Sequence, residues 1–247
     1  MRIEIGESLF FSWLRHVKGC QLVQTNWKTS PQWRELQNRA AIEQLLTVSR
    51  EFFQRQYGWE IYKNSSLDQL LVQGEIDLLG GCFAGDTAKI YAVEVAFHEK
   101  GLKYGNSTPE ICAQVVKKLL RAAMGLAGYL GVSTGEIIFA SPKIHPAVVG
   151  KLTPCVAEID RLLRAGGFNF TARLLANRDF AEQVIEPVLL AGKEVADTTD
   201  FFLRSYQLLK MFKVKIPPRR PRASRAPTSR APASRAPASR PPALPGG

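Results

Sequence analysis

GEIDLLG at residues 74–80 and YAVEVA at residues 91–96 are two short apolar stretches, and together they decide the fold. A two-residue loop at Gly85-Asp86 would join them as a hairpin, because glycine at the first loop position suits a type II′ turn. Counting outward from this loop pairs residue 84 with 87, 80 with 91 and 77 with 94. Directly opposed residues have Cβ atoms about 4.5–5.5 Å apart. We therefore expect Asp77 and Glu94 to lie side by side.

Strand alternation then assigns the two faces of this hairpin. It directs Glu94 and His98 to one face and sends the apolar side chains of the same strand to the other, which we take as the core face: Tyr91, Val93, Val95 and Phe97. On the first strand Glu75 precedes Asp77 by two residues, so a third carboxylate can lean toward the pair. A bulge at Gly80-Gly81 would shift this register.

Two or three carboxylates at one place indicate a site for a hard divalent cation. Magnesium binds through one or two carboxylates together with water and substrate phosphate, and manganese is the substitute that we expect. The chemistry that such a site favours is metal-assisted hydrolysis of phosphodiesters. The residues alone leave two other interpretations open, a solvated acidic face on an edge hairpin and a cation bound for stability without catalysis.

Residues 33–142 resemble the PD-(D/E)xK nuclease superfamily in the order of their motifs. The first acid of that family often ends a Gly-x-Ile-Asp pattern, matched by Gly74-Glu75-Ile76-Asp77, and the second opens a Glu-x-Lys, matched at Glu94 but not at Ala96. The resemblance implies an α/β protein with a restriction endonuclease-like core, in which a helix, a three-stranded meander, a second helix and a further strand follow one another. It also implies that Asp77, Glu94 and the main-chain carbonyl of Val95 bind the metal.

The first helix of that core is predicted over residues 31–56, where Ser30-Pro31 suits a helix start. Helical spacing from Leu36 and Ala40 places Glu43 on or beside the inward side. Several families of the superfamily carry a metal-binding or water-positioning glutamate on their first helix, so the resemblance implies such a role for Glu43. The alternative is a glutamate that only reaches solvent.

A second helix is predicted over residues 108–130 and a buried strand over 135–140, which completes the order that the family requires. The helix offers a replacement for the missing lysine, whose role is to stabilise developing charge or to orient water. We favour Lys118 ahead of Lys117, and His98 on the site face is a further candidate. Solvated helix cations are the alternative for both lysines, and a catalytically inactive descendant that only binds stays open.

The remaining segments decorate the core, which we bound at residues 31–145. Residues 1–30 indicate a helix and a strand packed on it, and residues 146–216 a mostly helical extension. Within that extension we expect a helix at 155–163, a strand at 168–174 and helices at 179–190 and 199–212. Residues 217–247 are mainly proline, arginine, alanine and serine, which predicts a disordered tail. Subtracting its seven arginines from the net charge of +11 leaves only +4 for residues 1–216, so the folded part is mildly basic.

Composition and motifs exclude several classes. With 247 residues and 45% hydrophobic content, the chain can bury one substantial core. The three histidines are scattered and the four cysteines lack Cys-x-x-Cys spacing, so a structural zinc site has no support. A Gly-x-x-x-x-Gly-Lys phosphate loop is absent from the sequence, which argues against an ATP-driven motor. Acids at positions 4 and 7 argue against a signal peptide, and no stretch reaches the roughly 18–20 apolar residues of a membrane span. We expect a cytoplasmic protein without a membrane partner.

The sequence thus predicts a magnesium-dependent nuclease whose partner is nucleic acid, with DNA expected. The resemblance implies a setting in defence against foreign DNA. A homodimer would bring together the two sites needed to cut both strands of a duplex, and an activating protein partner is a further expectation. The alternative is a catalytically inactive nucleic-acid-binding or assembly subunit with the same fold.

Overall fold

The computed structural model describes residues 4–30, 32–33, 35–84, 87–98, 101–195 and 199–212. All of them belong to one unit, Met1–Lys213. The predicted disordered tail at 217–247, the hairpin loop Gly85-Asp86 and Pro31 lie outside the described residues. None of the described helices combines the length and the apolar composition needed to cross a bilayer.

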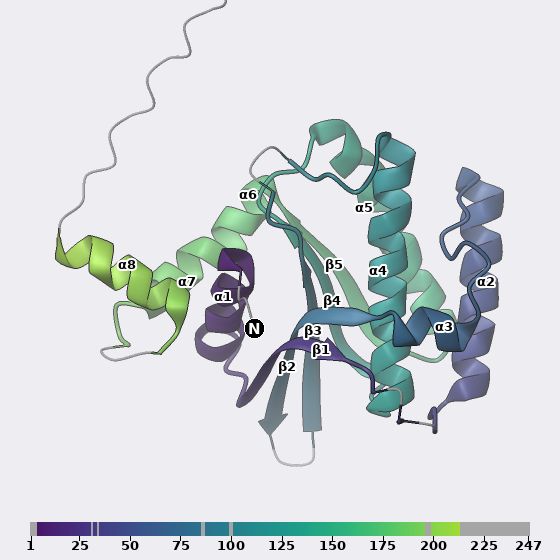
Figure 1. Ribbon diagram of the computed structural model, residues 1–247, viewed down its shortest axis with the longest axis horizontal. Coiled ribbons are helices and arrows are strands. Elements are labelled where there is room, and N and C mark those ends of the chain that lie inside the picture. Colours follow the sequence, from purple (N-terminus) through teal and green to yellow (C-terminus); the bar gives the residue numbers. More distant parts are fainter. Residues whose placement is uncertain are drawn as a thin grey trace, which may run out of the picture. The chain divides into compact units, whose positions relative to one another are not determined.

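Within these residues, a five-stranded sheet in the order β1-β2-β3-β4-β5 forms the centre of the unit (Figure 1). Its strands are β1 (Leu22–Lys28), β2 (Glu75–Ala84), β3 (Thr87–Val95), β4 (Thr134–Ser141) and β5 (Asn169–Ala176). Neighbours pair antiparallel from β1 to β3 and parallel from β3 to β5, so β2 runs opposite to the rest of the sheet. Helical crossovers join the parallel strands, as parallel pairing requires. The predicted α/β class is confirmed.

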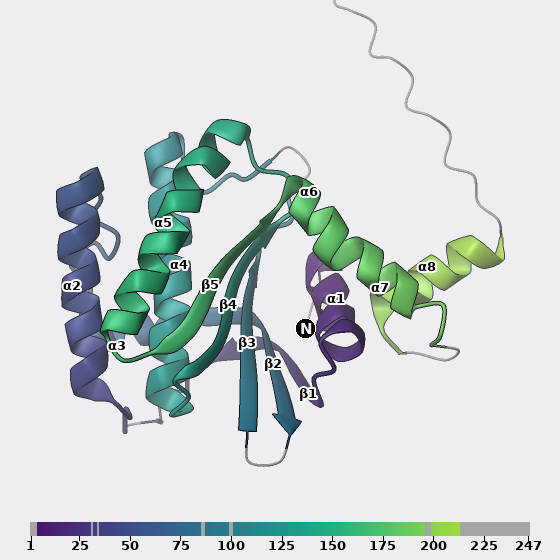
Figure 2. The ribbon, with the colours of Figure 1, turned by 180° about the vertical axis from the view of Figure 1, so that it is seen from behind.

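Helices cover both faces of the sheet (Figures 1 and 2). One face carries α2 (Arg39–Tyr57), α3 (Leu67–Val72), α4 (Thr108–Tyr129) and α5 (Pro146–Ala165). The other carries α1 (Ile5–Ser12) with its π-helical continuation η1 (Trp13–Val17), then α6 (Asn177–Phe180), the π-helical η2 (Ala181–Ile185), α7 (Glu186–Ala191) and α8 (Phe201–Met211). An apolar core fills each of these two interfaces.

This cover on both faces corrects the expected face assignment of β3. Tyr91 and Val93 face the core under α1, but Ala92 belongs to a second core, and Glu94 is buried on that same side against α4. Strands that take part in parallel pairing are buried on both faces because their crossover helices lie over the sheet. The interpretation as a solvated acidic face on an edge hairpin is therefore wrong.

The predicted hairpin register is confirmed over the recorded ladder. β2 pairs with β3 at Gly80 and Tyr91 and at Ala84 and Thr87, without a shift. The recorded pair nearest to the acids is Leu78 with Val93, and one further step in the same register places residue 77 opposite residue 94.

On the other side of β2, the pairing with β1 is interrupted at one residue. Leu78 pairs with Thr25 and Ile76 with Trp27, so the same register places Asn26 opposite residue 77. Asn26 has a left-handed backbone with a φ of 51°, and the ladder has no recorded pair at this position. Short polar residues such as asparagine are the ones that tolerate this conformation.

The first predicted core helix differs most from the structure. α2 begins at Arg39 rather than at residue 31, because Asn38 has a left-handed backbone with a φ of 54° that is incompatible with a helix continuing through it. Trp33 lies before the helix and packs against Trp27 and Tyr129, with ring centroids 6.0 and 5.6 Å away.

The order of elements also differs from the prediction, because β1 precedes α2. The chain runs α1, β1, α2, α3, β2, β3, α4, β4, so α2 and α3 are inserted into the three-stranded meander. A helix, a meander, a second helix and a strand then follow one another with α1 as the first helix. The helix and the strand predicted for residues 1–30 are confirmed as α1 and β1.

The strand predicted at 168–174 is confirmed as β5, which pairs parallel with β4 and enlarges the sheet. α5 begins at Pro146, well before the predicted residue 155, and His145 caps it by accepting a hydrogen bond from Ala147 N at 3.2 Å. α3 was not predicted, although Ser66 and Gln69 form a capping box at its start.

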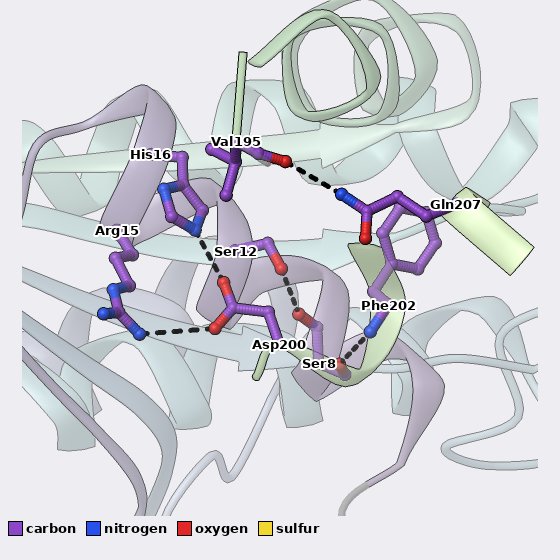
Figure 3. A network of polar contacts seen from close by, with 8 residues as sticks. All are labelled: Ser8, Ser12, Arg15, His16, Val195, Asp200, Phe202 and Gln207. Carbon is purple, nitrogen blue, oxygen red and sulfur yellow. Dashed lines mark hydrogen bonds and ion pairs between the residues drawn. The ribbon is translucent and has the colours of Figure 1, made fainter. Parts of the chain in front are cut away.

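A polar network ties the last described helix to the first (Figure 3). Asp200, at the N-terminus of α8, accepts a hydrogen bond from Arg15 Nη1 at 3.3 Å and pairs with His16 Nε2 at 2.7 Å. Ser8 Oγ accepts a hydrogen bond from Phe202 N at 2.8 Å. These contacts hold α8 against α1 and η1.

Candidate active site

Asp77 lies near the start of β2 and its side chain turns toward β3. Its Oδ2 accepts a hydrogen bond from Val95 N at 2.7 Å, which holds the carboxylate against the strand that carries Glu94. The charge of Asp77 contributes to raising the pKa of Glu94, in keeping with their proximity. The pair predicted by counting along the hairpin is thus brought together.

Glu94 is completely buried beneath α4. Lys118 Nζ donates a hydrogen bond to Glu94 Oε2, and Arg121 Nη2 lies 3.9 Å from Oε1. These two cations are three residues apart and so share one side of the helix. Oε1 itself has no hydrogen-bond partner among the described residues. Buried polar atoms are almost always hydrogen-bonded, so this oxygen is a candidate position for contact with a water molecule or a metal ion.

Burial raises the pKa of both acids. It raises the pKa of Glu94 to about 7, assisted by the charge of Asp77 and opposed by Lys118 and Arg121. Burial also raises the pKa of Asp77, against the lowering effect of Lys118. Burial alone would lower the pKa of Lys118, but the attraction of Glu94, Tyr104 and Asp77 outweighs it and raises that pKa. The lysine is therefore cationic at neutral pH.

The loop between β3 and α4 adds Tyr104 to the site, a residue that the sequence analysis missed. Lys118 Nζ lies 5.6 Å from the centre of the tyrosine ring, and burial raises the pKa of Tyr104 against the smaller lowering effect of the Lys118 charge. His98 packs edge-on against the same ring at 6.0 Å, and its Nδ1 accepts a hydrogen bond from Lys103 N at 3.3 Å. His98 therefore lies behind Tyr104 rather than against the two acids.

Glu7, in the first turn of α1, was also missed. Gly6 allows α1 to approach β3 closely, since a Cβ at this position would lie 2.8 Å from Val95 Cγ1. Glu7 accepts a hydrogen bond from Glu4 N at 3.4 Å, and its pKa is raised by burial and by the charge of Asp77. Nothing in the sequence around Gly6 and Glu7 indicated a site residue, because only the fold brings α1 over β3.

Glu43 lies elsewhere. Its side chain is 51% exposed and pairs with Arg39 Nη1 at 2.8 Å. The predicted inward orientation was wrong because it was counted from Leu36, which precedes the helix, and from Ala40, which is exposed; the buried side of α2 is formed by Ile42, Leu45, Leu46, Ser49 and Phe53. Glu43 therefore faces solvent, as the alternative interpretation stated.

Lys117 and Glu75 flank the site without joining its hydrogen bonds. Lys117 is half-buried, and its pKa is lowered by burial and by the nearby cations Arg121 and Lys63. Glu75 pairs with Lys28 Nζ at 2.8 Å, and its charge contributes to raising the pKa of Asp77. Of the two candidate lysines, Lys118 is the one in contact with an acid.

The donor atoms suit a hard cation with some ligands left to solvent or substrate. Across the described residues no group of three or more His, Cys, Asp or Glu side chains stands arranged as metal ligands. Asp77 and Glu94 supply two carboxylates, which is the number that magnesium commonly takes from a protein. The unsatisfied Glu94 Oε1 fits such an ion, and the carbonyl of Val95 stays a predicted third donor.

Comparison with family models, with curated proteins and with solved structures gave no match for this chain. Its function is therefore inferred from the residues of the site.

The raised pKa of Glu94 predicts a pH-dependent stability. Between about pH 4.5 and 7 the folded protein keeps a proton on Glu94 that the unfolded chain has released. The free energy of unfolding should therefore fall as pH rises through this window, by on the order of 3 kcal/mol. Urea denaturation at pH 5 and pH 8 with a chelator present measures the difference. Glu94→Gln should flatten the slope and the neighbouring Glu75→Gln should not; equal slopes in all three proteins would contradict the burial effect.

Proposed function

We propose that the chain is a magnesium-dependent nuclease that hydrolyses phosphodiester bonds, with DNA as its substrate. The observation that carries the proposal is the meeting of Asp77, Glu94 and Lys118 at one end of the sheet. That end is the carboxyl end of the parallel strands, where open α/β sheets place their ligands. Two acids and a lysine are also what the resemblance to PD-(D/E)xK nucleases implies, with the lysine moved from the strand to α4.

The arrangement of elements supports the same proposal. A helix, an antiparallel meander, a second helix and a parallel strand follow one another as α1, β1-β2-β3, α4 and β4, which is the order of a restriction endonuclease-like core. With α1 as the first helix, Glu7 takes the place that the resemblance gives to a helix-borne glutamate. Glu43 is not proposed for that role.

Each residue then has a distinct task. Asp77, Glu94 and the carbonyl of Val95 would hold a magnesium or manganese ion, which when bound supplies Lewis-acid activation of phosphate and water. Lys118 places a positive charge beside the carboxylates, where negative charge develops on the phosphate oxygens. Tyr104 would act through Lys118, because its ring lies beside the ammonium group.

A second candidate function is a catalytically inactive subunit that binds nucleic acid or assembles with a partner. The burial of Glu94 favours the inactive subunit, because this acid is fully buried and already forms ion pairs with Lys118 and Arg121. A metal ion would have to share Glu94 with both cations. In such a subunit the three charges would stabilise the fold instead of catalysing a reaction.

Metal-dependent cleavage separates the two candidates. The full chain should cut plasmid or single-stranded DNA when magnesium or manganese is added and should stop when a chelator is added. RNA is tested in parallel to define the substrate. Binding without cleavage under every condition would favour the inactive subunit. Defence against foreign DNA, a homodimer, an activating protein partner and a cytoplasmic location remain part of the proposal.

A further inference from the structure

A cavity of about 470 Å³ opens beside the proposed active site. Its walls come from the segment after α2, with Trp59 and Lys63, and from the start of α4, with Ala113 and Gln114; Tyr104 lies between them. Tyr104 also contacts Lys118, so one side chain borders both the cavity and the site. Gln114 lies one helical turn before Lys118 on the same side of α4. The cavity and the catalytic lysine are therefore neighbours.

The aromatic residues of the cavity wall pack against other rings, and Trp59 is largely buried. Trp59 stacks on Tyr57 with ring centroids 4.7 Å apart and lies parallel to Phe53 at 6.2 Å. Tyr104 packs edge-on against Phe139 at 5.9 Å. Fixed aromatic side chains, with the Gln114 amide in the wall, suit a flat ring that carries hydrogen-bonding groups on its edge. Nucleobases have this chemistry and stack on aromatic side chains without strong sequence preference.

The charges around the cavity favour a neutral base inside it and a phosphate group outside it. Glu60 and Glu110 belong to the cavity wall and disfavour an anion inside it. Lys63 is exposed at the wall, and its charge together with that of Arg121 contributes to lowering the pKa of Lys117. Lys63 at the cavity wall, Lys117 and the largely shielded Arg121, which also pairs with Glu94, together form what we call the basic strip. A strand would place its phosphates on this strip and one base in the cavity.

We propose that the cavity binds one unpaired nucleobase of the strand that is cut, so that the substrate is single-stranded or locally opened nucleic acid. This inference rests on the proposed nuclease function. A base inside a duplex is stacked and paired, and it must leave the helix to place its ring in this cavity. A fully paired duplex would therefore reach the basic strip but not the cavity.

Filling the cavity tests the proposal. Ala113→Phe adds a ring to the cavity wall without altering a charge or a carboxylate, and Ala157→Phe, at an exposed position on α5, is the matched control. Fluorescence anisotropy with a chelator present measures binding of a labelled single strand and of a blunt duplex. Ala113→Phe should weaken single-strand binding about tenfold or more and leave duplex binding within about twofold. The control should change neither.

A second variant covers the case in which Ala113→Phe does not fold. Gln114→Leu removes the amide from the wall, and it should also weaken single-strand binding selectively. Equal weakening of both substrates, or weakening of neither, would overturn the cavity proposal. Because binding is measured without turnover, selective weakening in a chain that never cuts would support the cavity while the nuclease proposal fails. Normal cutting of single strands by Ala113→Phe would reject the cavity and keep the nuclease.

Discussion

Replacing Asp77 by Asn or Glu94 by Gln is expected to lower metal-dependent cleavage at least about 100-fold. Loss of even an outer hydrogen-bond partner of a metal ligand costs about 10–100-fold, and these substitutions remove a charged ligand itself. Both keep the size of the side chain, and the amide oxygen introduced by Asp77→Asn can still accept a hydrogen bond from Val95 N.

Single-turnover cleavage of a labelled substrate measures the effect, with thermal melting to show that each variant is folded. Glu136→Gln is the matched control. Glu136 is 14% exposed and paired with Lys89 and Arg173, so it is also a shielded acid on a central strand. Cleavage that survives in Asp77→Asn and Glu94→Gln at the level of this control would place the chemistry elsewhere or reveal a contaminating enzyme.

Lys118→Met is expected to lower the cleavage rate by about 100- to 1,000-fold, the usual cost of removing one group that stabilises transition-state charge. It should also destabilise the fold by on the order of 3 kcal/mol at neutral pH, because Glu94 loses the closer of its two cations. Metal binding should persist, because both carboxylates remain.

Two further variants separate catalysis from stability. Lys117→Met removes the adjacent lysine, which has no contact with Glu94 in the described structure. It should weaken substrate binding, because Lys117 belongs to the basic strip, but at saturating substrate it should leave the single-turnover cleavage rate within a few-fold. Lys118→Arg restores the charge and should recover stability more fully than rate, since a planar guanidinium does not replace an ammonium group in geometry. A cleavage rate in Lys118→Met equal to that of the original chain would assign Lys118 a purely structural role.

The central pair of acids was predictable because hairpin geometry is local. A two-residue loop fixes the register of Asp77 and Glu94 by counting, and it needs no knowledge of the rest of the fold. Lys118 was predictable for a similar reason, as helical spacing and the missing strand lysine both directed attention to α4.

Other parts of the site depend on contacts between distant segments. Glu7 reaches the acids because α1 packs over β3, and no spacing in the sequence records that packing. Glu43 was misplaced because helical counting began at Leu36, before the left-handed Asn38 where α2 can start. The face of Glu94 was misjudged because alternation alone does not reveal that a strand has helices on both sides.

The contact of Asp200 with Arg15 and His16 has a consequence for synthesis on the ribosome. These partners are separated by 185 and 184 residues, so α1 leaves the ribosome long before α8 exists. Until then Phe10 and Leu14 lack the partners that Phe180, Val184 and Leu203 later supply. Domains of this size are translated at about 5–20 residues per second, which leaves an apolar sheet face uncovered for many seconds. The apolar side of α1 and η1 is therefore expected to stay partly exposed in the nascent chain until α8 has been made, although every residue of the candidate site has been synthesised by then.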